Sequence, residues 1–280
     1  MKNYGLDLDL EKSHQSEEDE VFGAFSSMCL AVIPEVEREH YLPEGEVQKG
    51  AEDTMDCASR GPINILETKF NWLWRNNKIC PENKEWLKMN GYVHNDSVTF
   101  SDAFIAIKSG TTRGGNSLKA PLHAIHEYGL IPKHRLPLEP TMTWGDYHNP
   151  ERITRELEKL GEEFKSRFPI RYAKVFRNHF TELYKEDVLD LAGYAWSEPV
   201  LGIYPKSGNQ PNHVFMGIKR PTHTIFDNYI DVVDNDFIKR LSSDYDLLDY
   251  GYRVYITGDI IPTLKLLGYW QKFLKLCTNF

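Results

Sequence analysis

Helical sequence patterns come before strand patterns in this chain of 280 residues. The clearest helix is predicted at 149–168, where Asn149 serves as the N-cap, Pro150 lies in the first turn and apolar residues recur at helical spacing. Further helices are predicted at 57–76, 101–108, 118–128 and 186–194, and strands at 199–204, 213–218, 222–226 and 250–257. This order predicts an α+β fold with a helical lobe followed by a sheet lobe.

The charge balance argues against nucleic acid as a partner. The chain has 33 basic and 41 acidic residues, a formal net charge of −8, and no basic cluster with interleaved aromatic residues. No stretch approaches the ~18 consecutive apolar residues that a membrane span requires. No secretory signal is visible at the N-terminus, which favours a cytoplasmic or virion-associated protein.

Composition changes divide the chain into three parts. Residues 1–45 form a polar N-terminal extension with an apolar patch at 22–33, interpreted either as a docking arm or as an inhibitory segment. Residues 46–258 form the main domain, and residues 259–280 form an amphipathic tail. Either terminal segment could join the protein to a larger assembly. The main domain is subdivided into a helical lobe at about 57–140, a helical insertion at about 145–185 and a β lobe at about 195–258.

One of the four cysteines has a setting suited to chemistry. Without a CxxC motif or regular spacing, the four are interpreted as reduced thiols, with a Cys29–Cys80 disulfide as the alternative. Cys57 differs because a polar stretch precedes it and a helix follows, so unpaired N–H groups and the helix dipole would stabilise its thiolate. Pro62 could delay the start of the regular helix, and Asp56 is expected to point away from the sulfur and to cap the helix. The cysteines are Cys29, Cys57, Cys80 and Cys277.

The order of the polar residues resembles that of the papain-like cysteine peptidases over residues 46–258. Cys57 matches the nucleophile that opens the long helix of that family, and His213 matches the histidine that opens a later strand. The pair Asp227-Asn228 follows the next strand, where the family has its third catalytic residue. The resemblance implies a two-lobe fold with a helical left lobe, an antiparallel β right lobe and an active-site cleft between them.

The resemblance extends to residues that would contact substrate. Gly114 and Gly115 occupy the place of a glycine pair that offers backbone groups to an extended polypeptide. Two predicted strands, Glu198–Ile203 and Tyr250–Tyr255, resemble strands of the family's right lobe. A polypeptide substrate is therefore the expected partner.

The chain departs from the family in the residues around the nucleophile. The family's oxyanion glutamine lies six residues before the cysteine, where this chain has Ala51, and the nearest glutamine is Gln48. The aromatic residue that follows the family's nucleophile is replaced by Ala58. These changes favour a divergent member of the type found in bacteria and their viruses.

The resemblance implies hydrolysis of peptide bonds through a thioester. Cys57 would attack the scissile carbonyl, and His213 would pair with the thiolate and protonate the leaving amine. Asp227, or alternatively Asn228, would orient the imidazole. The Cys57 N–H and the Gln48 side chain would stabilise the oxyanion.

Two other functions are compatible with the same residues. The trio could serve a cell-wall amidase or a transglutaminase-like acyl transferase, or the fold could persist as a catalytically silent binding or structural module, such as a virion or assembly component. We expect no cofactor and no metal site. His123 and His126 are spaced like a metal pair on a helix, but no third ligand stands at a suitable spacing, which favours a solvated helix face.

Overall fold

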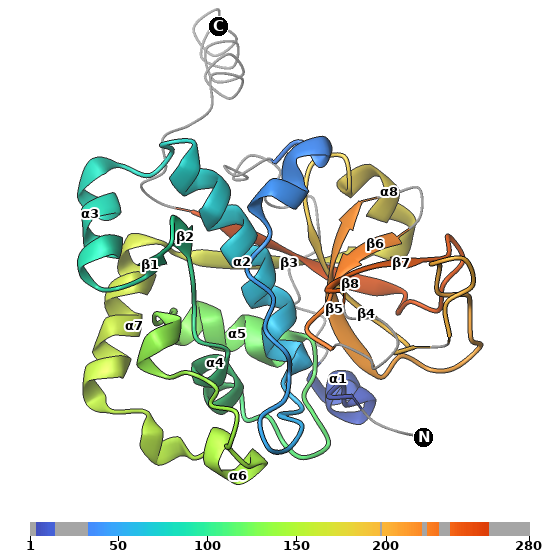
Figure 1. Ribbon diagram of the computed structural model, residues 1–280, viewed down its shortest axis with the longest axis horizontal. Helices are drawn as coiled ribbons and strands as arrows, with labels where there is room; N and C mark the ends of the chain where they lie inside the picture. The colour runs from blue at the N-terminus through green and yellow to red at the C-terminus, as the bar shows by residue number, and fades with distance from the viewer. Residues whose placement is uncertain (1–3, 15–32, 197, 220–222, 230–235, 258–280) are drawn as a thin grey trace, which may run out of the picture.

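One half of the molecule is an antiparallel sheet (Figure 1). The computed structural model describes residues 4–14, 33–196, 198–219, 223–229 and 236–257. The strands of the sheet are β3 (Ile170–Phe176), β4 (Leu189–Gly193), β5 (His213–Lys219), β6 (His223–Phe226), β7 (Ile238–Leu241) and β8 (Tyr250–Ile256). Their order is β3-β8-β4-β5-β6-β7. Strand β6 is antiparallel to its neighbours β5 and β7. The end of β6 therefore lies close to the first halves of β5 and β7.

The other half is helical. Its helices are α2 (Cys57–Arg75), α3 (Pro81–Met89), α4 (Asp102–Lys108), α5 (Lys119–Tyr128), α6 (Trp144–Tyr147) and α7 (Arg155–Arg167). A hairpin of β1 (Val93–His94) and β2 (Ser97–Val98) lies between α3 and α4. Outside this half lie α1 (Leu8–His14) and α8 (Phe180–Leu183). Short 3-10 helices occupy Glu35–Tyr41, Lys133–Arg135, Pro150–Arg152 and Arg177–His179. The α+β prediction with a helical lobe and an antiparallel β lobe is confirmed.

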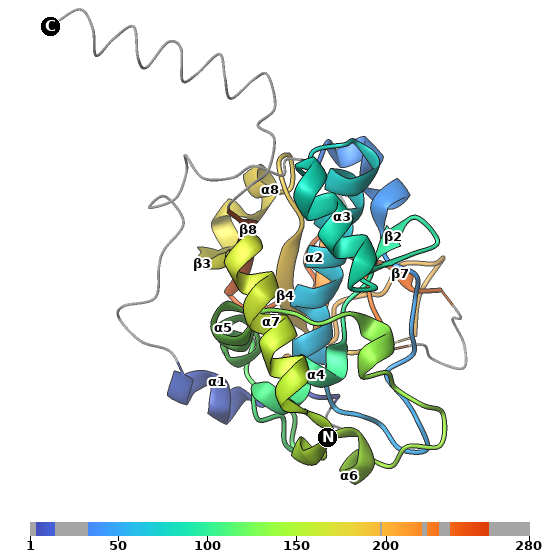
Figure 2. The ribbon, with the colours of Figure 1, turned by 90° about the vertical axis from the view of Figure 1, so that its left-hand side faces the viewer.

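Helix α2 lies between the two lobes. It contacts β4, β5 and β8 of the sheet lobe and α4 and α5 of the helical lobe. Helices α3 and α7 lie in front of it when the helical lobe faces the viewer (Figure 2). Glycine at position 61 permits this close packing, because a Cβ there would lie 2.3 Å from Oδ1 of Asp190 and 2.9 Å from Cγ1 of Val214. The buried Lys69 ammonium lies 2.8 Å from Asp187, which joins the middle of α2 to the sheet lobe.

Several predicted elements have different bounds or a different type. The helix predicted at 149–168 begins only at Arg155, with Thr154 as its N-cap, because the turn capped by Asn149 is a separate 3-10 helix. The helix predicted at 186–194 is wrong, since this segment contains the buried strand β4. The strand predicted at 199–204 is also wrong, because the chain turns there and Leu201 is 99% exposed with a φ of 51°.

The strands at both edges of the sheet were not expected. Strand β3 lies inside the range assigned to a helical insertion, so that assignment is wrong over residues 170–176. It pairs with β8 along its whole length, and this tertiary pairing determines its conformation. Strand β7 pairs with β6 at the opposite edge of the sheet.

Part of the N-terminal extension is docked on the body. The carboxylate of Glu11 on α1 is buried, and it accepts hydrogen bonds from the N–H of Leu118 at 2.6 Å and from the hydroxyl of Tyr250 at 2.7 Å. Most of the apolar patch predicted at 22–33, and the amphipathic tail predicted at 259–280, lie outside the described residues. In the described parts of the chain, no helix combines the length and the apolar character needed to cross a membrane.

Candidate active site

The nucleophile candidate is the first residue of α2. The backbone carbonyl of Asp56 accepts the N–H groups of Ser59 and Arg60 at 2.8 and 3.1 Å, which starts the helix at Cys57. The possibility that Pro62 delays the helix is therefore wrong, and Pro62 lies within it. The Cys57 side chain is buried at the lobe junction, at the end of the helix where the dipole favours a negative charge.

An imidazole and a carboxylate lie together beside this thiol. His213 is the first residue of β5, and Asp227 follows directly after the neighbouring strand β6. Nε2 of His213 lies 2.6 Å from Oδ1 of Asp227, and His213 also shares a hydrogen bond with the Cys57 thiol. The Trp196 ring packs against the imidazole at 5.6 Å between centroids. Folding thus brings Cys57, His213 and Asp227 together in the order that proton transfer between thiol and imidazole requires.

Burial and charge act on these three groups in opposite directions. Burial raises the pKa of the Cys57 thiol, and the charge of His213 opposes this only in part. Burial disfavours the His213 cation, but Asp227 and Cys57 outweigh it and hold its pKa well above the usual range. Burial would raise the pKa of Asp227, yet the charges of His213 and Lys239 keep it below its ordinary value. Burial thus opposes ionisation of the Cys57 thiol, whereas the charges of Asp227 and Cys57 favour the protonated form of His213.

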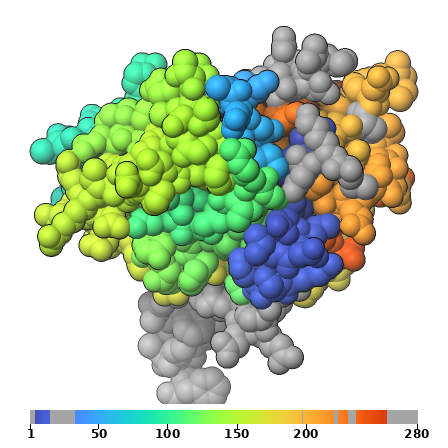
Figure 3. All heavy atoms as spheres, turned by 90° about the horizontal axis from the view of Figure 1, so that it is seen from below, coloured from blue at the N-terminus to red at the C-terminus, as the bar shows by residue number. Residues whose placement is uncertain are grey.

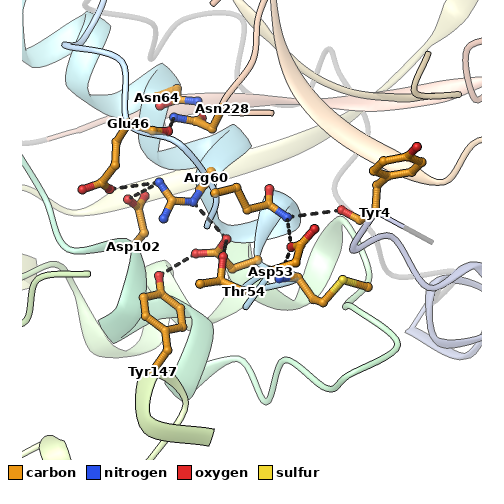
Figure 4. Close-up of polar contacts among 12 residues, drawn as sticks. Tyr4, Glu46, Asp53, Thr54, Arg60, Asn64, Asp102, Tyr147 and Asn228 are labelled. Carbon is orange, nitrogen blue, oxygen red and sulfur yellow. Dashed lines mark hydrogen bonds and ion pairs between the residues drawn. The ribbon is translucent and has the colours of Figure 1, made fainter. Parts of the chain in front are cut away.

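Asp227 and Asn228 were both candidates for the third residue, and only Asp227 contacts the imidazole. The Asn228 side chain accepts a hydrogen bond from Asn64 at 2.6 Å and donates one to the backbone carbonyl of Glu46 at 2.8 Å. Figure 4 shows Asn228 beside Asn64 and Glu46. Its contacts join the loop after β6 to α2.

The side chain of Gln48, the glutamine predicted as an oxyanion donor, contacts the chain next to Gly5. Nε2 of Gln48 donates to the backbone carbonyl of Tyr4 at 3.3 Å and to Oδ1 of Asp53 at 3.2 Å (Figure 4). The same Tyr4 carbonyl oxygen lies 3.3 Å from Nδ1 of His213. A carbonyl placed between the imidazole and a fixed amide donor has the environment that an oxyanion needs.

Residues 4–7, here called the N-terminal segment, lie directly over the thiol. The N–H groups of Tyr4 and Leu6 both donate to the carbonyl of Asn212 at 3.3 Å. The carbonyl of Gly5 accepts from the N–H of Asn116 at 2.9 Å, and a Cβ at Gly5 would lie 2.9 Å from the Cys57 sulfur. In the space-filling view, the dark-blue N-terminal residues lie between the green helical lobe and the orange sheet lobe (Figure 3).

The predicted glycine pair lies against this segment, and the two glycines differ. Gly115 has a φ of +96°, and a Cβ there would lie 2.1 Å from the carbonyl oxygen of Gly5, so only glycine allows the two backbones to approach. Gly114 lies at the tip of the turn, where a Cβ would lie 3.4 Å from the Asp7 carboxylate.

A buried charge cluster, which the sequence patterns did not predict, supports the start of α2. The Asp56 carboxylate accepts from Arg60 at 2.9 Å, from Thr54 at 2.6 Å and from Tyr147 at 2.5 Å, and the expected side-chain cap is absent. Burial alone would raise the pKa of Asp56, but Arg60 and these hydrogen bonds lower it. Arg60 lies 3.0 Å from Glu46 and 3.1 Å from Asp102 (Figure 4). The i, i+4 spacing of Asp56 and Arg60 was the only signal of this cluster in the sequence.

Comparisons with known proteins place the fold among cysteine proteases. No family model matches the chain, and no curated protein matches its sequence. Similar solved structures include xylellain, a cysteine protease from Xylella fastidiosa, with a TM-score of 0.56, 13% identity, and coverage of 92% of this chain and 96% of xylellain. The proform of the ragweed pollen cysteine protease Amb a 11 gives a TM-score of 0.55 at 10% identity, covering 91% of this chain and 74% of Amb a 11. Digestive procathepsin L 3 from Tenebrio molitor larval midgut gives 0.52 at 11% identity, covering 91% and 76%.

These likenesses define the class of fold. The chain has the two-lobe architecture of the papain-like cysteine proteases, in a form that has diverged far in sequence. The helical lobe, the antiparallel β lobe and the position of α2 between them correspond to the resemblance drawn from the sequence.

Proposed function

We propose that the protein is a thiol-dependent peptidase that uses Cys57, His213 and Asp227 as a catalytic triad. The observation that carries the proposal is the backbone carbonyl of Tyr4, which lies 3.3 Å from both the imidazole of His213 and the amide of Gln48 above the thiol. A substrate carbonyl in the same position would be next to the nucleophile, the proton carrier and an oxyanion donor at once.

The proposed reaction is acyl transfer in two halves. The Cys57 sulfur, after giving its proton to His213, attacks the carbonyl carbon and forms a tetrahedral oxyanion that the Gln48 amide stabilises. The C–N bond then breaks, and the His213 imidazolium protonates the leaving amine. In the second half, His213 takes a proton from water, whose oxygen attacks the thioester and releases the free carboxylic acid and the thiol.

An extended polypeptide is the substrate that the surroundings favour. The N-terminal segment is held through its backbone, by the carbonyl of Asn212 on one side and by both backbone groups of Asn116 on the other. Backbone hydrogen bonds of this kind recognise any extended chain independently of its side chains. This observation supports a peptidase over an amidase or acyl transferase that acts on other groups.

The N-terminal segment itself is proposed to be inhibitory. A Cβ at Gly5 would lie 2.9 Å from the Cys57 sulfur, and burial raises the pKa of this thiol, which must ionise before attack. Displacement of residues 4–7 would admit water and substrate together, so activity would require release of the segment.

Labelling with an epoxide inhibitor of papain-like enzymes tests the proposal. We expect the adduct to map by mass spectrometry to Cys57 and to be lost in His213→Ala, because the imidazole no longer accepts the thiol proton. Cys80→Ala is the matched control, since Cys80 is the other thiol in the described residues and lies outside the site. Equal, slow labelling of all four thiols, unaffected by His213→Ala, would indicate a catalytically silent module. A peptide library would then separate an endopeptidase from an amidase.

A further inference from the structure

The carboxylate of Asp227 has a second cationic neighbour besides the imidazole. Lys239 lies on β7, the strand next to β6, and its Nζ is 3.3 Å from Oδ2 of Asp227. His213 lies against the other oxygen of the same carboxylate. The three side chains are essentially inaccessible to water.

The Lys239 ammonium is held in place by two backbone acceptors. It donates to the backbone carbonyls of Tyr229 at 2.9 Å and Asp236 at 3.0 Å. Its contact with Oδ2 of Asp227 at 3.3 Å is an ion pair. A buried charge whose position is fixed by hydrogen bonds acts on its neighbours at short range with little screening by solvent.

We propose that Lys239 is a positioning residue that holds the Asp227 carboxylate against His213 and offsets its charge, so that the imidazole can release its proton during turnover. The inference rests on the proposed function and deepens it. It concerns how tightly the imidazole holds the proton that the leaving amine must receive.

The charges of the site explain why such an offset is needed. A thiolate–imidazolium pair is neutral, and a carboxylate as the third residue adds one buried negative charge. That charge stabilises the imidazolium and would slow proton delivery to the leaving amine. The positive charge of Lys239 returns the net charge of the site to zero. The hydrogen bond of 2.6 Å between His213 and Asp227, which orients the imidazole, stays intact.

Few other ionisable groups face the imidazole in the described residues. Cys57 approaches it from α2. The rings of Tyr4 and Tyr229 have centroids 6.1 and 5.9 Å from that of His213. Asp227 is therefore the anion whose charge Lys239 can offset, and Cys57 is present unchanged in every variant below.

The titration of the His213 ring, followed by NMR in the full chain, tests the inference without any turnover. We compare Asp227→Asn with the double variant Asp227→Asn/Lys239→Met, and the native chain with Lys239→Met. Removal of the cation is expected to raise the titration midpoint of His213 by about one pH unit on both backgrounds, since a nearby positive charge disfavours the imidazolium. The lowest midpoint is expected in Asp227→Asn, where the cation remains without its anion.

A matched control separates this effect from lost packing. Lys69→Met removes another buried lysine that is paired with an aspartate, and it should lower stability without moving the His213 midpoint. A midpoint in the double variant that is not above that of Asp227→Asn would overturn the inference. Because the readout is a ring titration, it remains interpretable if the native protein hydrolyses no peptide, an outcome that would instead count against the proposed function. In an active protein, the basic limb of kcat/KM should move in the same direction as the midpoint.

Discussion

The adjacent side chains of Asp227 and Asn228 leave the loop after β6 in different directions, and they are expected to have different roles. Asp227→Ala removes the group that orients His213, so kcat/KM should fall by about 10²–10⁴-fold. Asn228→Ala instead leaves the Asn64 amide and the Glu46 carbonyl without their partner, which should lower the free energy of unfolding by about 1–3 kcal/mol with a much smaller effect on turnover. Steady-state kinetics and denaturant unfolding of both variants measure the two effects. Equal losses of activity would contradict this division of roles.

Single residues also show where sequence reasoning succeeds and where it fails. The positions of Cys57 and His213 at the starts of α2 and β5 could be predicted, because an element's start can be recognised from local pattern. Lys239 could not be predicted, since one lysine in a short edge strand is usually a solvated residue. Its role depends on the pairing of β6 with β7, which local sequence does not encode.

On helix α2, the buried carboxyl of Glu67 makes stability depend on pH. Burial and the charge of Asp102 raise the pKa of Glu67 to about 8, while one of its oxygens accepts the N–H of Phe100 at 2.7 Å. Between the pKa of the unfolded chain, near 4.5, and this value, the folded state binds more protons than the unfolded state, so stability should fall as pH rises. Glu67→Gln keeps the hydrogen-bond acceptor and removes the titrating group. Between pH 5.5 and pH 8, its free energy of unfolding should therefore rise by about 1–3 kcal/mol relative to that of the native chain.

Thermal unfolding of the two proteins at both pH values provides the measurement. Glu162→Gln is the matched control, because Glu162 is exposed on α7 and its replacement should leave the pH dependence as it is in the native chain. A Tm difference between native and Glu67→Gln that does not change with pH would show that the carboxyl is ionised in the folded protein.

The N-terminal segment can be displaced by adding one methyl group. In Gly5→Ala the new Cβ would meet the Met55 carbonyl at 2.7 Å and the Cys57 sulfur at 2.9 Å, and the φ of +109° adds backbone strain. We expect Cys57 to react with the epoxide at least ~10-fold faster, which corresponds to a loss of about 1.4 kcal/mol in docking of the segment. Gly208→Ala is the control, since Gly208 also has a positive φ but its Cβ would meet no atom within 4 Å. Equal rates in the two variants would mean that the segment does not limit access.

At the scale of the whole molecule, the lobes could be predicted from sequence better than the sheet could. Helices α4 and α5 and strands β5 and β8 lie within two residues of their predicted bounds, because each carries clear local signals. Strand β4 was missed because all of its residues are buried, and a strand buried on both faces loses the alternation that identifies it. The apolar run at 199–204 was wrongly predicted as a strand, because Val200, Leu201 and Ile203 lie in an exposed turn.

The placement of α2 has a mechanical consequence for how the two lobes could move. Cys57 starts a helix that is joined to the sheet by Gly61 against Asp190, by Asn64 to Asn228 and by Lys69 to Asp187. The sulfur and the imidazole therefore lie on elements that are packed directly against each other, although they come from different halves of the chain. If the outer helices shift to admit ligands of different width, the spacing of the reacting atoms need not change. The outer helices would then adapt to the width of the ligand, while α2 and the sheet would keep the reacting atoms in place.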